Sequence, residues 1–162
     1  MSDRVTVIVL AAGAGTRMKS RRAKVLHEVG GRSMLEHALR ATAGLAPHRT
    51  VAVVGHDREQ VGGAIDAMDV EVVQAVQTEQ LGTGHAVRVA LEAVPEALAG
   101  TVVITYADVP LLTDRTLADL VADHRAAERT VTVLSSVVAD PTGYGRIVRD
   151  ADGSVVAIRE HR

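Results

Sequence analysis

The sequence predicts an α/β domain with a Rossmann-like, three-layer arrangement and a mostly parallel sheet. Short runs rich in β-branched residues alternate with longer stretches of helical spacing. The first run, VTVIVL, is apolar throughout, as a strand covered on both faces requires. The chain has no cysteine and 47% of its residues are hydrophobic. The fold must therefore rest on an aliphatic core between layers rather than on disulfides.

The expected strands, in chain order, are Val5–Leu10, Thr50–Val54, Val70–Val76, Thr101–Thr105 and Val131–Val138. The expected helices are Ser33–Ala43, Glu59–Met68, Gly84–Val94 and Thr116–Glu128. Ser33 and Glu36 have the spacing of a capping box, which predicts where the first helix begins. Strands that alternate with helices imply βαβ units and helices on both faces of the sheet.

The end of the chain has a different pattern. The polar run Asp150–Gly153 separates two strand-like segments, Gly145–Arg149 and Val155–Arg159, and predicts a β-hairpin. The chain ends soon after this hairpin, at Arg162, with no further helix. We therefore expect residues 1–162 to be the N-terminal part of a domain that is incomplete at its C-terminus.

Composition excludes several classes of function. A net charge of −2 argues against a nucleic-acid binder, and Tyr106 and Tyr144 are the only aromatic residues available for stacking on bases. The apolar runs are far shorter than the roughly 20 residues of a membrane span, and no signal peptide is visible. We expect a cytoplasmic protein with no nucleic-acid partner and no membrane partner.

Three unusual segments follow expected strands: Ala11–Lys24, Gln77–His85 and Tyr106–Leu112. The carboxyl ends of parallel strands meet at one edge of a sheet, where ligands bind in open α/β folds. The sequence therefore predicts one site built from all three segments.

The first segment suits a polyphosphate. Gly13 and Gly15 let the backbone turn and approach a ligand closely. Five cations follow within eight residues, with no acid among them: Arg17, Lys19, Arg21, Arg22 and Lys24. A plain glycine turn with a solvated basic stretch would look the same. A dinucleotide fold, with Asp57 on a ribose, is weakened because Met18 replaces the third glycine of G-x-G-x-x-G; no P-loop motif occurs.

The other two segments carry a polar amide and a carboxylate. Gln77 offers a donor and an acceptor to the edge of a base, and Gly82 and Thr83 stand where a helix begins. Asp108 follows an apolar strand, where a carboxylate can hold magnesium. Taken singly, an ordinary turn explains each segment at least as well.

Four motifs together resemble a known family. LAAGAGTRM, followed by Lys24-Val25-Leu26, resembles the sugar-nucleotide pyrophosphorylases. QTEQLGTGHA, ADVPLL and DPTGYGRI are similar to segments of the bifunctional N-acetylglucosamine-1-phosphate uridyltransferase / glucosamine-1-phosphate acetyltransferase family. The motifs occur in family order across nearly the whole chain. Ala23 stands where that family usually has proline, and Ala107 where it commonly has glycine.

The resemblance implies a nucleotidyltransferase fold and a role for each motif residue. It implies that Arg17 and Lys24 are catalytic and bind phosphate, that Asp108 binds Mg²⁺, and that Tyr106, Gly145 and Glu160 contact the sugar. The implied nucleotide-binding residues are Leu10, Ala11, Ala12, Gly13, Gly15, Lys24, Gln77, Gly82 and Thr83.

The implied reaction transfers UMP from UTP to N-acetylglucosamine 1-phosphate, which gives UDP-N-acetylglucosamine for cell-wall synthesis and releases pyrophosphate. Full-length members of the resembling family trimerise through an acetyltransferase β-helix domain. The motifs of this chain match only the uridyltransferase part of that family. Full-length members also supply asparagines that bind sugar and metal, whereas this chain has no asparagine, so we expect weak nucleotide binding and poor turnover. The alternatives are another nucleotidyltransferase, acting on a different sugar phosphate or a cofactor, and a non-catalytic nucleotide-binding module.

Overall fold

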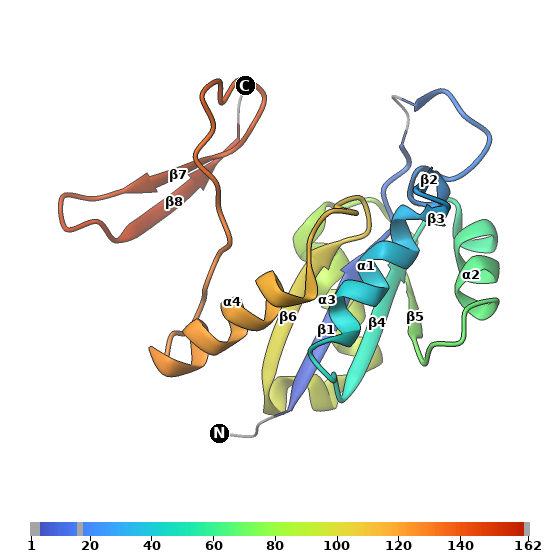
Figure 1. The fold of residues 1–162 in the computed structure, drawn as a ribbon, viewed down its shortest axis with the longest axis horizontal. Helices are drawn as coiled ribbons and strands as arrows, with labels where there is room; N and C mark the ends of the chain where they lie inside the picture. The colour runs from blue at the N-terminus through green and yellow to red at the C-terminus, as the bar shows by residue number, and fades with distance from the viewer. Residues whose placement is uncertain (1–3, 16–17, 161–162) are drawn as a thin grey trace. The chain divides into compact units, whose positions relative to one another are not determined.

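The computed structural model describes residues 4–15 and 18–160, and the chain divides into two compact units, Met1–Thr130 and Val131–Arg162. In the described part of the first unit, four parallel strands form one sheet in the order β5-β4-β1-β6 (Figure 1). These strands are β1 (Val5–Leu10), β4 (Arg49–Val54), β5 (Val73–Val76) and β6 (Thr101–Tyr106). The predicted parallel sheet is confirmed.

Helices cover both faces of this sheet. The helices are α1 (Met34–Ala43), α2 (Arg58–Asp66), α3 (Thr83–Ala93) and α4 (Asp114–Ala126), with short 3₁₀ turns η2 (Lys24–Leu26) and η3 (Pro95–Ala99). Val7 and Val9 of β1 belong to a buried cluster with residues of α1, α2 and α4. Ile8 points to the opposite face and belongs to a second cluster with α3 and η3. Alternate residues of one strand thus separate two cores, which confirms the three-layer arrangement.

The strand order creates a switch point beside β1. The chain passes from β1 to β4 and then outward to β5, but the next strand, β6, pairs with the other side of β1. Leu10 and Tyr106 are partners at the ends of β1 and β6. In doubly wound sheets the segments that leave such a pair diverge to opposite sides, which opens a crevice for a ligand.

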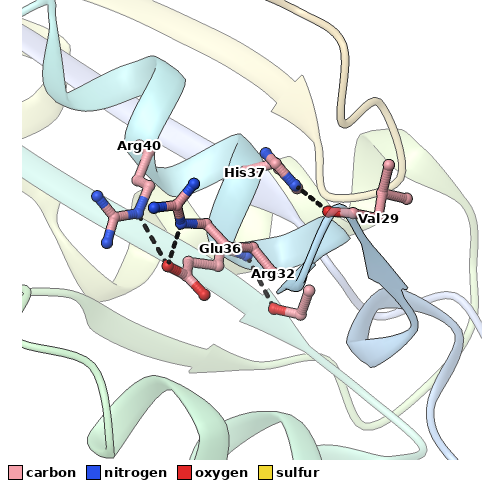
Figure 2. A network of polar contacts seen from close by, with 6 residues as sticks. Val29, Arg32, Glu36, His37 and Arg40 are labelled. Atoms are coloured by element: carbon pink, nitrogen blue, oxygen red, sulfur yellow. Dashed lines mark hydrogen bonds and ion pairs between the residues drawn. The ribbon is translucent and has the colours of Figure 1, made fainter.

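Helix α1 begins where its sequence predicts. The hydroxyl of Ser33 accepts a hydrogen bond from the backbone N–H of Glu36 at 3.1 Å. The carboxylate of Glu36 pairs with Arg32 at 3.3 Å and with Arg40 at 2.9 Å (Figure 2). His37 contacts the carbonyl of Val29 at 2.7 Å, so α1 is tied to the small hairpin of β2 (Glu28–Val29) and β3 (Arg32–Ser33) (Figure 2).

The second unit contains the predicted hairpin. Strands β7 (Arg146–Arg149) and β8 (Val155–Arg159) pair antiparallel, with an irregularity between Val148 and Arg149. The carboxylate of Asp150 accepts hydrogen bonds from the backbone N–H groups of Asp152 at 3.1 Å and Ser154 at 2.9 Å. These bonds close the turn that the polar run predicted.

The expected strand Val131–Val138 is wrong. These residues belong to no strand, and Val131 and Val137 are strongly exposed. A β-branched run favours extended backbone only weakly, and a strand needs a neighbour to accept its backbone hydrogen bonds. No such pairing exists within the described residues. A smaller difference is that β5 begins at Val73, three residues later than expected.

Within residues 4–15 and 18–160, no helix is both long enough and apolar enough to cross a membrane.

Candidate functional site

A cavity of about 220 Å³ lies at the carboxyl ends of β1 and β6. Ten residues that the sequence singled out line this cavity: Leu10, Ala11, Ala12, Gly13, Lys24, Gln77, Gly82, Thr83, Tyr106 and Asp108. Three further lining residues were missed: Val25, Gln80 and Ala86. The structure thus brings the three predicted segments together around one space.

Backbone hydrogen bonds hold each segment where it leaves the sheet. The N–H of Ala11 donates to the carbonyl of Val53 at 2.9 Å, and that of Ala107 donates to Leu10 at 3.0 Å. The N–H of Gln77 donates to Val54 at 2.8 Å. These bonds continue the parallel ladders one residue past the strands, so the rigid sheet fixes the direction in which each loop starts.

The glycine loop passes close to Lys24. Gly15 has φ +57°, and a Cβ there would lie 2.6 Å from the Cβ of Lys24. Gly15 therefore serves both its backbone conformation and its contact with the lysine stem. Among the described residues, no atom lies within 4 Å of such a Cβ on Gly13. Arg17, the other predicted catalytic cation, lies outside the described residues.

A glutamine from α2 anchors the basic segment before Lys24. The amide oxygen of Gln60 accepts from the N–H of Ala23 at 3.1 Å, and its amide nitrogen donates to the carbonyl of Arg21 at 3.1 Å. Ala23 has φ −52°, a value that proline also adopts. A hydrogen bond that proline could not make therefore holds the backbone in a proline-like conformation at this position.

Lys24 and Asp108 form an ion pair across the cavity. The ammonium of Lys24 donates to the Oδ2 atom of Asp108, and about a third of each side chain remains exposed. Ala107, which precedes the aspartate, is fully buried in the same cluster as Val7. Its methyl group therefore packs in the core, and alanine is accommodated where the resembling family commonly has glycine.

A polar cluster lies where the sequence predicted recognition of a base. The side chain of Gln77 is 4% exposed, and its amide nitrogen lies 3.2 Å from the carbonyl of Gly82 and 3.1 Å from Nδ1 of His85. Gly82 has φ +94° and precedes α3, whose first residue is Thr83. Gln77, Gly82 and Thr83 form one wall of the cavity.

Gln80 braces the glycine loop from this wall. Its amide nitrogen donates to the carbonyl of Ala12 at 2.9 Å. Gly55, after β4, lies against both groups, because a Cβ there would be 2.7 Å from the Ala12 carbonyl oxygen and from the Gln80 amide nitrogen. The glycine directly after a strand was a signal in the sequence, but nothing local indicated which groups would approach it.

A separate cavity of about 480 Å³ lies over the N-terminus of α2 and includes Asp57. Asp57 is the residue that would bind a ribose if the domain were a dinucleotide-binding fold. Gln77 and Gln80 line both cavities. Lys24, the candidate phosphate ligand, and Asp108, the candidate metal ligand, line the smaller of these two cavities.

The two remaining sugar-site candidates lie together in the second unit. A Cβ on Gly145 would lie 3.7 Å from Oε1 of Glu160 and 3.7 Å from the carbonyl of Arg159. The preceding turn is ordered by Asp140, whose carboxylate accepts from the N–H of Thr142 at 3.0 Å. Hydrogen bonds from the side chain and then the backbone of Thr142 lower the pKa of Asp140.

The carboxylate at the cavity beside Lys24 suits a hard divalent cation that also binds oxygen atoms of a substrate. Within the described residues, no cluster of three or more His, Cys, Asp or Glu side chains could cage a metal. Asp108 supplies one partly exposed carboxylate at the cavity. One carboxylate, with phosphate oxygens and water as the other ligands, is the usual protein environment of Mg²⁺ at nucleotide sites.

The sequence matches a family model described as a MobA-like NTP transferase domain over residues 7–151. The chain is 60% identical over 158 residues to the Bifunctional protein GlmU of Thermobifida fusca, and 55% identical over 167 residues to that of Nocardia farcinica. These alignments cover 96% and 99% of this chain. The chain spans about a third of the length of these relatives, 33% and 34%.

Solved structures show the same fold. Rv0371c from Mycobacterium tuberculosis has a TM-score of 0.61 at 25% identity, over 78% of this chain and 63% of that one. A manganese complex of Rv0371C has a TM-score of 0.57 at 23% identity, over 78% and 62% of the two chains. A 4-diphosphocytidyl-2C-methyl-D-erythritol synthase from Anaerococcus prevotii has a TM-score of 0.67 at 16% identity, over 98% and 66%.

The family model extends from β1 to the hairpin turn and includes the whole cavity. The chain therefore belongs to the family of MobA-like NTP transferase domains.

Proposed function

We propose that residues 1–162 form part of a sugar-nucleotide pyrophosphorylase domain that transfers UMP from UTP to N-acetylglucosamine 1-phosphate with the help of Mg²⁺. The products are UDP-N-acetylglucosamine, a cell-wall precursor made in the cytoplasm, and pyrophosphate. Family membership supports nucleotidyl transfer as the class of reaction. The GlmU relatives, at 60% and 55% identity, support the choice of substrates.

One observation carries the proposal: a single cavity unites the glycine loop, the Lys24–Asp108 pair and the Gln77–Gly82 wall. A nucleoside triphosphate needs all three kinds of group. Loop amides and a lysine bind phosphate, a carboxylate holds a divalent cation, and an oriented amide recognises a base.

The proposed chemistry is an in-line displacement at the α-phosphorus of UTP. A phosphate oxygen of the sugar phosphate forms the new P–O bond, while the bond to the bridging oxygen of pyrophosphate breaks and that oxygen keeps the electron pair. Lys24 lies where its ammonium can neutralise phosphate charge, and the amides of the glycine loop can orient the triphosphate. No covalent intermediate with the protein is needed.

Asp108 is the group of this chain that would hold the metal ion. When bound, a divalent ion supplies positive charge to the phosphate oxygens during the displacement. The buried position of Ala107 fixes the backbone beside this carboxylate, so the ligand is presented from the end of β6 and not from a mobile loop.

The test is calorimetric titration of the chain with UTP and Mg²⁺, with ATP, GTP and NAD in parallel. Selective, Mg²⁺-dependent binding of UTP is expected, and Asp108→Asn should abolish the Mg²⁺ dependence. Asp119→Asn is the matched control, because Asp119 is an exposed residue of α4 that pairs with Arg115. Absence of binding for all four ligands, or preference for another one, would overturn the proposal.

A further inference from the structure

His85 contacts the one buried amide side chain of the described part of the cavity wall. His85 is the third residue of α3, and its Nδ1 atom lies 3.1 Å from Nε2 of Gln77 and 3.0 Å from the carbonyl of Glu79. Gln77 is 4% exposed, so its polar atoms need partners within the protein or in a bound ligand. The contact between Gln77 and His85 therefore affects how the amide is presented.

The carbonyl of Gly82 settles which amide atom faces it. A carbonyl oxygen can only accept, so the atom of Gln77 that lies 3.2 Å away must be the nitrogen. The amide nitrogen has two hydrogens, one for the Gly82 carbonyl and one that points to Nδ1 of His85. This leaves the amide oxygen, which accepts no hydrogen bond from the residues that the structure describes.

The same contacts limit the role of Nδ1 of His85 to two alternatives. Nδ1 either carries a proton and donates to the Glu79 carbonyl, or lacks one and accepts from Gln77. The Glu79 carbonyl already accepts from the N–H of Leu81 at 2.9 Å. The second amide hydrogen of Gln77 has no other acceptor among the described residues. If Nδ1 is the acceptor, this hydrogen also has a partner, and the ring proton then lies on Nε2.

We propose that His85 is a positioning residue for base selection: its unprotonated Nδ1 locks the Gln77 amide so that the amide oxygen is presented to the base. Uracil offers a ring N–H at N3 as a donor to this oxygen. Cytosine has an unprotonated N3, whose lone pair would meet the lone pairs of the oxygen. The site therefore takes uracil and rejects cytosine. This inference rests on the proposed function, since it concerns the base of the same nucleotide.

The binding test compares UTP with CTP in the wild-type chain and in three variants. His85→Leu removes the acceptor and keeps an apolar side chain of similar size. His85→Asn keeps an oxygen near the position of Nδ1. We expect the ratio of UTP affinity to CTP affinity to fall about tenfold in His85→Leu, which corresponds to one net hydrogen bond, and to recover in His85→Asn. His37→Leu, a histidine change on α1, is the control and should keep the wild-type ratio.

A purely structural role for His85 predicts that His85→Leu weakens UTP and CTP equally, and an unchanged ratio would overturn the inference. A second measurement needs no nucleotide. In ¹⁵N NMR spectra of the free chain, Nδ1 of His85 should have the shift of an unprotonated ring nitrogen, and the Gln77 side-chain amide should lie apart from the solvent-exposed glutamines. A protonated Nδ1 at neutral pH would refute the inference.

The two proposals fail in different ways. If the wild-type chain binds none of the nucleotides, the proposed function fails, whereas the NMR measurement still decides the role of His85. If the chain binds UTP selectively but His85→Leu keeps the selectivity, the proposed function stands and the inference about His85 is wrong.

Discussion

The ammonium of Lys24 is paired with the carboxylate of Asp108, so the proposed phosphate ligand and the proposed metal ligand neutralise each other in the free protein. A metal ion that approaches Asp108 alone meets a lysine already in place. A nucleotide that draws Lys24 to its phosphates exposes the carboxylate. The pair therefore makes metal binding and nucleotide binding mutually supportive, because each ligand removes the partner that opposes the other.

Replacing the lysine should change two affinities in opposite directions. In Lys24→Met, Asp108 loses its cationic partner, so Mn²⁺ without nucleotide should bind about fivefold more tightly, the scale of one partly exposed ion pair. UTP with Mg²⁺ should bind at least about tenfold more weakly, because a charge-assisted hydrogen bond to phosphate is lost. Electron paramagnetic resonance of free Mn²⁺ and calorimetry measure the two affinities.

The matched control is Arg88→Met, since Arg88 lies on the exposed face of α3 and pairs with Glu92. Both affinities should stay at wild-type values in this variant. Unchanged or weaker Mn²⁺ binding in Lys24→Met would show that the ion pair does not compete with the metal.

Gly15 should tolerate no side chain. Its φ of +57° costs an L-residue about 1–2 kcal/mol, and a Cβ would lie 2.6 Å from the Cβ of Lys24. Gly15→Ala is therefore expected to lower the free energy of unfolding by about 1–3 kcal/mol and to weaken UTP binding by displacing Lys24. Urea denaturation and calorimetry measure these effects. Gly13→Ala should leave the unfolding free energy nearly unchanged, because no atom of the described residues lies within 4 Å of its Cβ.

Much of the fold could be predicted from the sequence, because the residue preferences of each strand agree with the strand's position in the sheet. The apolar run of β1 is buried on both faces, with Val7, Ile8 and Val9 all at 0% exposure. The cavity follows from the same logic, because parallel strands bring their carboxyl ends together whatever the loops contain. Residues chosen at three strand ends, each group more than 20 positions from the next in the chain, therefore line one space.

The features that were missed depend on long-range contacts. Gln60 and Gln80 hold the first loop through bonds that span 37 and 68 residues. The residues around a glutamine on a helix or in a turn do not indicate that its side chain will bond to a distant backbone group. Val131–Val138 failed for the converse reason: its local preference for extended backbone was visible, but the partner strand that would satisfy it was not.

Two neighbouring glycines of α2 should respond differently to alanine. A Cβ on Gly63 meets no atom within 4 Å in the part of the chain that the structure describes, so Gly63→Ala should raise the free energy of unfolding by about 0.5–1 kcal/mol through helix propensity. A Cβ on Gly62 would lie 2.6 Å from the amide oxygen of Gln74. The amide nitrogen of the same side chain donates to Asp66 at 2.7 Å, which holds the oxygen in place. Gly62→Ala should therefore lose this gain. Equal stabilisation of both variants in urea denaturation would contradict the packing seen here.

The contact between Gln60 and the backbone before Lys24 can be tested by removing its hydrogen bonds and then adding a proline at position 23. Gln60→Ala removes the acceptor for the Ala23 N–H and the donor to the Arg21 carbonyl. We expect the free energy of unfolding to fall by about 1–2 kcal/mol. UTP binding should weaken as well, because Lys24 directly follows the released backbone.

Ala23→Pro should rescue the Gln60→Ala variant. Proline holds φ near −65°, close to the −52° of Ala23, and has no N–H to leave unsatisfied. In the wild-type background the same change should be unfavourable, because it leaves the amide oxygen of Gln60 without the N–H that it accepts from. A double-mutant cycle in UTP affinity and unfolding free energy measures the difference. If proline has the same effect in both backgrounds, Gln60 does not hold Lys24 in place through Ala23.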